Sequence, residues 1–305
     1  MMKRRSILTA LLGIAIAHAS FSVAHANPSN RVQASAPVQV QFDRHGNPVL
    51  GSAAFVVANQ RTGDILSERA ADRVMPIASI TKIMTAMVVL DAGQSLSEVL
   101  TITADDIDRL KGTGSRLPVG ARLTREEMLH IALMSSENRA ASALARHYPG
   151  GQRAFIEAMN VKARMLGMWT TRFADSTGLD PRNVASAHDL VKLVQAASTY
   201  PLIREFSTAD HRFVRVGNGQ LRYGNSNGLV REPDWSVSLS KTGFIREAGR
   251  CLVMQTWVRG EPVIMVLLNS EGRYTRTADA KRLKHWLETT GAYRVAAAPA
   301  RRGGS

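Results

Sequence analysis

The chain has 305 residues, of which 45% are hydrophobic and 21% charged, and its formal net charge is +14 at pH 7. This length suffices for one large domain or two small ones, and the composition is that of a globular protein rather than a disordered or fibrous one. The basic excess suits a polyanionic partner, but the basic residues are scattered and only 6% of residues are aromatic, which argues against nucleic-acid binding.

The first 26 residues have the pattern of a secretory signal peptide. Residues 3–5 are basic, residues 7–17 form an uncharged apolar run, and residues 24–26 give a small-x-small cleavage site. The apolar run is shorter than the roughly 20 residues that a membrane span needs, and no cysteine lies near the cleavage point. We therefore expect an exported, soluble, periplasmic protein without a stable membrane anchor.

The globular part is expected to begin near Gly51, after an extended arm at residues 27–50 that is rich in Pro, Ala, Gln and Asn. Two β-rich segments, residues 53–59 and 64–69, flank a short turn and predict a hairpin. A helix is expected at about residues 78–92.

A block of helices is predicted next. Thr124 and Glu127 form a capping box that opens one helix. Further helical patterns cover residues 137–147, 151–166 and 187–199.

The spacing of the hydrophobic residues then changes from a helical one to that of short strands rich in β-branched residues. These strands are expected at residues 236–241, 251–258 and 262–268. The single cysteine, Cys251, excludes an intramolecular disulfide, and its apolar surroundings favour a buried side chain. A last amphipathic helix is expected at 275–290, before a short basic tail.

This order predicts an α+β fold. An antiparallel sheet built from both ends of the chain and flanked by helices, with a helical subdomain inserted between, is the simplest arrangement of these elements. One domain would then cover residues 51–292, and residues 293–305 would form the tail.

The histidines and glycines do not form a metal or phosphate site. None of the eight His residues makes an H-x-x-x-H pattern or a Cys/His cluster, and no glycine-rich phosphate loop precedes a helix. We expect no metal and no cofactor.

Ser79 and Lys82 are the first candidates for chemistry. Three residues apart on a helix, they would share one face, and a neutral lysine amine could accept the serine proton. The pattern alone is weak, because it recurs at residues 238–241 on a predicted strand, and the pair could equally be a helix cap and a solvated charge.

Two further strings strengthen the assignment. Ser136-Glu137-Asn138 falls at the junction of two predicted helices, and residues 241–243, Lys-Thr-Gly, end a predicted strand. Each string alone could be an N-cap or a strand end. In the order S-x-x-K, S-x-N, K-T-G they are the motif set of penicillin-recognising serine enzymes.

With these motifs, the chain resembles the low-molecular-mass penicillin-binding proteins, which are serine-type D-alanyl-D-alanine peptidases. The likeness runs from about residue 51 to 290 through "PIASITKIMTAM", "LMSSENRAA", "DSTGLDPRN", "SKTGF", "EAGRCLVM" and "YTRTADAKRLKHWL". The strings "DSTGLDPRN", "SKTGF" with "EAGRCLVM", and "YTRTADAKRLKHWL", together with "IDRLKGTGSRLPVG", are most similar to the endopeptidase branch, the penicillin-binding protein 7 type. The resemblance implies a β-lactamase/transpeptidase-like fold.

The resemblance also implies roles for the motif residues. Ser79 would be the nucleophile, Lys82 its general base, and Ser136 the relay of the proton to the leaving amine. The backbone N–H groups of Ser79 and Phe244 would form the oxyanion hole.

The other motif residues would bind substrate. Asn138 would bind the substrate amide and help to hold Lys82, and Lys241 would be the cation that keeps Lys82 neutral. Thr242 would bind the carboxylate side of the D-amino acid, and Gly243 would let the substrate backbone lie against the strand.

The implied substrates are peptidoglycan stem peptides, with β-lactams as covalent inhibitors and weak electrostatic association with the envelope. Few residues follow the K-T-G string, which favours a cross-link endopeptidase over a D-Ala-D-Ala carboxypeptidase with an added C-terminal domain. No E-x-x-L-N string supports a β-lactamase, and the complete motif set argues against a non-catalytic wall-binding protein.

Overall fold

The computed structural model describes residues 40–44 and 48–292, all within one compact unit, Val38–Ser305. The predicted signal peptide of residues 1–26, most of the predicted arm and the predicted tail lie outside the described residues. Within the described part of the chain, no helix is both long enough and apolar enough to cross a membrane.

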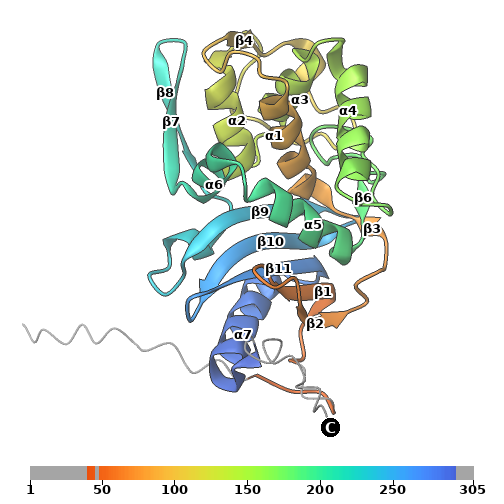
Figure 1. Cartoon of the computed structure of the whole chain (residues 1–305). Helices are drawn as coiled ribbons and strands as arrows, with labels where there is room; N and C mark the ends of the chain where they lie inside the picture. Colours follow the sequence, from red (N-terminus) through yellow and green to blue (C-terminus); the bar gives the residue numbers. More distant parts are fainter. Residues whose placement is uncertain (1–39, 45–47, 293–305) are drawn as a thin grey trace, which may run out of the picture. The chain divides into compact units, whose positions relative to one another are not determined.

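A five-stranded antiparallel sheet with strand order β2-β1-β11-β10-β9 forms the centre of this unit (Figure 1). Its strands are β1 (Ser52–Asn59), β2 (Ile65–Arg69), β9 (Val237–Ile245), β10 (Gly249–Val258) and β11 (Glu261–Ser270). The first strand pairs with the last, so that Val56 lies opposite Val266. The α+β prediction with a sheet built from both chain ends is therefore confirmed.

Both faces of this sheet are buried. Along β1, Val56 and Ala58 belong to the core on the side of the helical subdomain, whereas Phe55 and Val57 belong to a second core under α7 (Thr275–Thr290). Successive side chains of a strand point to opposite faces, so a strand buried on both faces is a continuous apolar run. Figure 1 shows α5 (Ala187–Ala197) on one face of the sheet and α7 on the other.

The helical subdomain lies between β2 and β9 in the chain. Its helices are α1 (Thr81–Asp91), α2 (Arg125–Met134), α3 (Asn138–Arg146), α4 (Gly151–Met165), α5 (Ala187–Ala197) and α6 (Pro201–Thr208). Helix α1 is buried from Thr81 to Val89, although this stretch includes the polar side chains of Thr81, Lys82 and Thr85. The helix that carries Lys82 is thus fixed by packing all around it.

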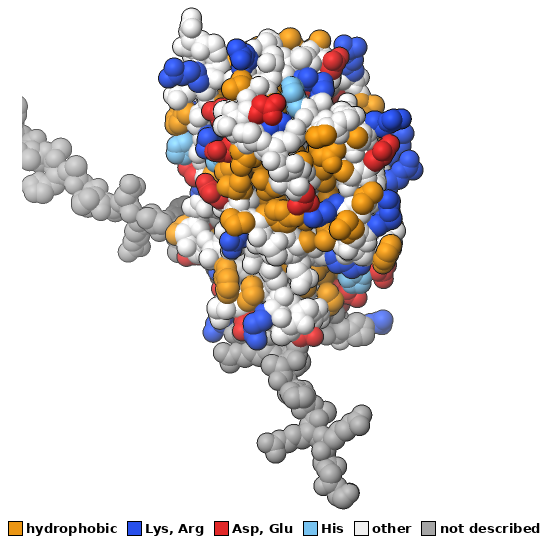
Figure 2. Space-filling model, turned by 45° about the horizontal axis from the view of Figure 1, so that its top comes forward, with side chains coloured by type: hydrophobic (Ala, Val, Ile, Leu, Met, Phe, Trp, Pro, Cys, Tyr) orange, Lys and Arg blue, Asp and Glu red, His pale blue; other side chains and the backbone are white. Residues whose placement is uncertain are grey.

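Short elements complete the unit. The small two-stranded pairs are β3 (Met75–Pro76) with β6 (Val184–Ala185), β4 (Val99–Thr101) with β5 (Arg122–Thr124), and β7 (His211–Val216) with β8 (Gly219–Gly224). The 3-10 turns are η1 (Ala78–Ile80), η2 (Ala104–Asp106) and η3 (Gly228–Arg231). On the face in Figure 2, hydrophobic side chains gather near the middle and Lys and Arg side chains lie mostly along the right-hand edge.

Two predicted boundaries were wrong. The helix expected from residue 78 begins as the 3-10 turn η1, and α1 proper starts at Thr81. The strand expected to end at Lys241 continues to Ile245, because the chain turns only at residues 246–248, directly before β10 begins at Gly249. Helix α6 and the β7–β8 hairpin were not predicted; β7 buries only Val214, so it lacks the apolar alternation that marks a strand.

Candidate active site

Ser79 lies in the turn η1, and Lys82 lies in the first turn of α1. The Nζ atom of Lys82 is 2.9 Å from the Oγ atom of Ser79. The residue before Ser79, Ala78, has a φ of +49°, a left-handed conformation that costs roughly 1–2 kcal/mol for a residue with a Cβ atom. The surrounding packing therefore holds the serine in a strained turn.

Two glycines let neighbouring segments approach this turn. A Cβ atom at Gly178 would lie 2.0 Å from the carbonyl oxygen of Ala78. A Cβ atom at Gly243 would lie 2.9 Å from the carbonyl oxygen of Ile77 and 3.0 Å from the backbone nitrogen of Ser79. Gly243, predicted to make room for substrate, is thus also needed for β9 to pack against the turn that carries Ser79.

The amine of Lys82 is buried and surrounded by three oxygens. Besides Ser79 Oγ, its Nζ atom lies 2.6 Å from the carbonyl oxygen of Thr177 and 2.8 Å from Oδ1 of Asn138. These two oxygens are carbonyl oxygens, which can only accept hydrogen bonds. The orientation of the Asn138 amide is supported by its Nδ2 atom, which donates to Thr113 Oγ1 at 3.1 Å. A neutral amine therefore donates both of its hydrogens to them and turns its lone pair toward the Ser79 hydroxyl.

Burial favours this neutral form. Desolvation lowers the pKa of Lys82 to about 8, although the charges of Asp175 and Glu137 act in the opposite direction. An amine with this pKa is neutral in a usable fraction of molecules near neutral pH.

The carbonyl of Thr177 is positioned by a loop that Asp175 closes. The Asp175 carboxylate accepts hydrogen bonds from the backbone N–H groups of Thr177, Gly178 and Asp180 at 3.0, 2.6 and 3.0 Å. It also accepts from Thr177 Oγ1 at 2.9 Å and from Asn183 Nδ2 at 2.6 Å. This loop corresponds to the string "DSTGLDPRN", residues 175–183, for which the sequence predicted no role.

Lys241 is also buried, and its Nζ atom donates to the carbonyl oxygen of Thr242 at 2.8 Å. Burial, then the charges of Lys82 and Arg276, lower the pKa of Lys241 well below its ordinary value. The charge of Lys82 thus disfavours the charged form of Lys241. Burial is the larger cause of the lowered pKa at both lysines.

Ser136 and Asn138 lie at the junction of α2 and α3. Ser136 has a φ of +64°, and Asn138 is the first residue of α3. Glu137 caps that helix, since its Oε1 atom accepts from the backbone N–H of Arg139 at 3.1 Å and from Ser115 Oγ at 2.7 Å. The cap fixes the loop that presents the two predicted site residues.

A cavity of about 200 Å³ joins these groups. Its lining residues are Ser79, Thr113, Ser136, Asn138, Leu179, Thr242, Gly243, Phe244 and Arg276. Of the eight predicted site residues, only Lys82 and Lys241 are absent from the lining, and both are buried.

Arg276 and Ser226 were not predicted. Nη1 of Arg276 donates to the carbonyl oxygens of Gly243 and Cys251 at 3.0 and 3.2 Å, and Ser226 Oγ lies 2.7 Å from Thr242 Oγ1. Arg276 lies in the string "YTRTADAKRLKHWL", which contributed to the family resemblance, and this string is the only signal in the sequence that could have pointed to it.

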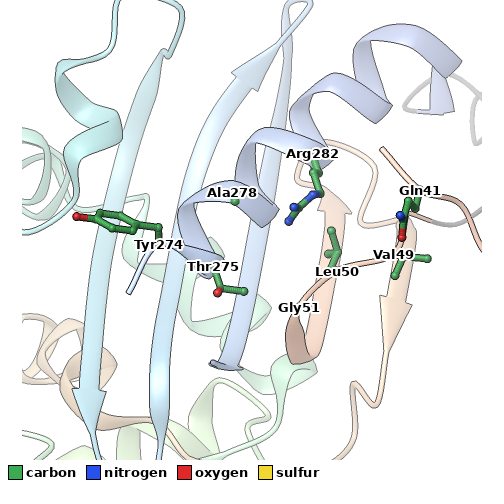
Figure 3. A pocket seen from close by; sticks show the side chains of 8 residues that line it. All are labelled: Gln41, Val49, Leu50, Gly51, Tyr274, Thr275, Ala278 and Arg282. Carbon is green, nitrogen blue, oxygen red and sulfur yellow. The ribbon is translucent and has the colours of Figure 1, made fainter. Parts of the chain in front are cut away.

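A larger cavity, of about 660 Å³, lies between the beginning of β1 and the first turns of α7 (Figure 3). None of the predicted site residues lines it. The larger cavity thus holds none of the predicted groups, whereas six of the eight predicted residues line the smaller one.

A family model described as D-alanyl-D-alanine carboxypeptidase matches residues 42–272. The chain is 46% identical over 282 residues to a D-alanyl-D-alanine endopeptidase of Pseudomonas aeruginosa, which covers 92% of this chain and 88% of that protein. It is 46% identical over 244 residues to a D-alanyl-D-alanine endopeptidase of Escherichia coli, which covers 79% of each chain. The cefotaxime-bound form of penicillin-binding protein D2 from Listeria monocytogenes has a similar fold, with a TM-score of 0.70, 28% identity, and coverage of 79% of this chain and 98% of that chain.

Proposed function

The chain belongs to the D-alanyl-D-alanine carboxypeptidase family, and from this premise we propose that it cleaves D-alanyl cross-links between peptidoglycan stem peptides. Family membership makes it a serine-type D-Ala-D-Ala peptidase, a hydrolase. The endopeptidase assignment is supported by the relatives named D-alanyl-D-alanine endopeptidase at 46% identity. The alternative is a carboxypeptidase that removes the terminal D-Ala of pentapeptides, the activity in the family's description.

The chemistry rests on one observation, the 2.9 Å separation of Lys82 Nζ and Ser79 Oγ in a buried site. In the acylation step, Ser79 Oγ attacks the carbonyl carbon of D-Ala while the neutral Lys82 amine accepts the hydroxyl proton. Proton transfer of this kind contributes about 10²–10⁴-fold to a rate.

The peptide bond then breaks and an ester on Ser79 forms. The leaving nitrogen takes up a proton, which Ser136, on the wall of the same cavity, would pass from Lys82. Water attacks the ester, its proton goes to Lys82, and the serine hydroxyl is regenerated, so that hydrolysis consumes one water per bond.

The oxyanion that forms in both steps would lie between the backbone N–H groups of Ser79 and Phe244. Support comes from the packing of β9 on η1, where a Cβ atom at Gly243 would lie only 3.0 Å from the Ser79 nitrogen. One such donor is worth about 10²–10³-fold in rate.

Substrate would bind between Asn138 and the β9 edge of the sheet. β9 is an outer strand of the sheet, so the part of its edge beside the cavity would pair with an extended peptide. Thr242, with Lys241 behind it, would bind the carboxylate next to the leaving nitrogen, and Asn138 would bind the substrate amide.

Four further proposals concern export, envelope association, inhibition and the domain boundaries. Export to the periplasm is supported by the predicted signal peptide at residues 1–26, and weak attraction to an anionic envelope by the net charge of +14. Acylation of Ser79 by β-lactams is supported by the cefotaxime-bound relative. The domain boundaries at residues 51 and 292 stay part of the proposal.

The test is digestion of purified cross-linked muropeptide dimers by the mature protein and by Ser79→Ala. We expect wild type to yield monomers and the variant to yield none, since the ester cannot form without the serine oxygen. Release of free D-Ala from pentapeptides with dimers left intact would instead support the carboxypeptidase alternative. Absence of both reactions would overturn the proposal.

A further inference from the structure

A second cavity, of about 410 Å³, adjoins the active site across the loop between α2 and α3. Ser136 and Asn138 line both this cavity and the one that contains Ser79. Residues 114–116 and Tyr223 of β8 form its other walls. We call this space the side cavity, and none of the steps described above uses it.

Arg116 gives the side cavity a positive charge. Its guanidinium carbon lies 4.0 Å from the centre of the Tyr223 ring, and its Nη1 atom donates to the carbonyl oxygen of Arg222 at 2.6 Å. Arg116 forms no ion pair with any residue in 40–44 or 48–292. A planar guanidinium that is held in place, with donors still free, is suited to binding a carboxylate.

Tyr223 supplies an independent observation. Its side chain is 1% exposed, and its buried hydroxyl has no hydrogen-bond partner in the described part of the chain. Such a hydroxyl costs stability unless an acceptor reaches it. Burial, together with the charge of Glu137, raises the pKa of Tyr223 to about 12, so the hydroxyl keeps its proton at neutral pH and can donate it in a hydrogen bond.

Glu137 sets the orientation of a ligand in the side cavity. Its carboxylate lies on the same wall and accepts from Ser115 Oγ and from the backbone N–H of Arg139. A negative group would therefore lie toward Arg116, where it meets the guanidinium rather than the Glu137 carboxylate.

We propose that the side cavity binds the leaving-group side of a cross-linked substrate, with Arg116 and the Tyr223 hydroxyl holding a carboxylate of the departing stem peptide. The inference rests on the proposed function, because Ser136 faces the leaving nitrogen only if it relays the proton. A single D-Ala ends one residue past the scissile bond, about 3.5 Å of chain. A stem peptide continues beyond that point and carries further carboxylates, so the side cavity selects cross-linked peptides over pentapeptides.

The test measures kcat/KM for a purified cross-linked muropeptide dimer and for a pentapeptide muropeptide. We expect Arg116→Gln to lower the ratio of the dimer value to the pentapeptide value about tenfold, as for loss of one charge-assisted hydrogen bond, chiefly through a higher KM for the dimer. The matched control is Arg153→Gln, which removes the same charge from an exposed position on α4. The control is expected to keep the wild-type ratio.

Tyr223→Phe gives a second measurement. Removing only the hydroxyl should lower the same ratio and at the same time raise Tm, because an unpaired buried hydroxyl is lost. If both variants keep the wild-type ratio, or lower both kcat/KM values equally, the side cavity does not bind the leaving group. If wild type releases D-Ala but leaves dimers intact, this inference fails while the serine peptidase assignment stands; if wild type acts on neither substrate, the proposed function fails as well.

Discussion

At the scale of single residues, the proposed role of Lys82 as general base makes the reactivity of Ser79 depend on the protonation of the Lys82 amine. Its pKa is lowered to about 8 by burial, and a lysine is neutral above its pKa. The rate of acylation by a fluorescent penicillin is therefore expected to rise about tenfold per pH unit below pH 8 and to level off above it. Stopped-flow labelling across this range measures the profile.

Asp175→Asn tests the same assignment through a neighbour. The negative charge of Asp175 raises the pKa of Lys82, so its removal should move the rising limb of the profile to lower pH. The amide keeps the shape of the side chain, although it weakens the hydrogen bonds to Thr177 and Gly178. A profile that moves to higher pH, or does not move, would contradict the assignment of Lys82 as base.

At the scale of elements, the site depends on close contacts between segments that are distant in sequence. Gly178→Ala places a Cβ atom 2.0 Å from the Ala78 carbonyl and forces a residue with φ of +82°, so it should displace the turn that carries Ser79. We expect loss of penicillin acylation by at least about tenfold, since misplacement by 1 Å can cost 10²-fold.

The matched control is Gly217→Ala in the β7–β8 turn. Gly217 also has a positive φ, of +57°, but a Cβ atom there has no atom within 4 Å. This variant should lose about 1 kcal/mol of stability and keep the acylation rate. Equal acylation rates for both alanine variants would show that the close approach of Gly178 to the turn η1 does not affect the reactivity of Ser79.

The elements also show what the sequence could and could not predict. The last helix, 275–290, was predicted with the bounds it has, because its pattern and its Gly291 cap are local. The strand β9 was predicted to stop at Lys241, because Lys-Thr-Gly has the composition of a turn. Its continuation depends on the approach of β9 to Ser79, a contact across more than 150 residues that no local pattern encodes.

The site was predictable to the extent that its residues lie in motifs. All eight predicted residues lie at one place, but the carbonyl of Thr177 and the side chain of Arg276 were not assigned roles. A backbone carbonyl has no residue type that identifies it, and Arg276 contacts β9 from the first turn of α7, by donating to the carbonyl oxygen of Gly243. Both depend on tertiary structure.

At the scale of the whole molecule, the sheet needs both ends of the domain. Asp279 of α7 is fully buried and accepts hydrogen bonds from Gly51 N, Ser52 N and Ser52 Oγ at 3.1, 2.8 and 2.7 Å. It also pairs with Arg282 at 2.9 Å. The carboxylate thereby ties the last helix to the first strand of the sheet.

Asp279→Ala should therefore lower the free energy of unfolding by about 3 kcal/mol, because the buried N–H of Ser52 loses its acceptor and several hydrogen bonds to a charged group are lost. For a domain of this size that corresponds to a drop in Tm of roughly 6–12 °C. The exposed Asp234 offers a control, since Asp234→Ala should change Tm little. Equal Tm values for the two variants, measured by calorimetry, would show that the hydrogen bonds from Asp279 to residues 51 and 52 do not stabilise the fold.

The central claim, that Ser79 is the nucleophile of this site, is tested most directly by locating the covalent adduct that a penicillin forms. After labelling, trypsin should release residues 74–82, a peptide that ends at Lys82 and contains Ser79 as its single serine. Mass spectrometry is expected to find the penicilloyl ester on that peptide, and Ser79→Ala to carry none. An adduct on any other peptide, or an unlabelled peptide from an enzyme that still cleaves muropeptides, would contradict the account.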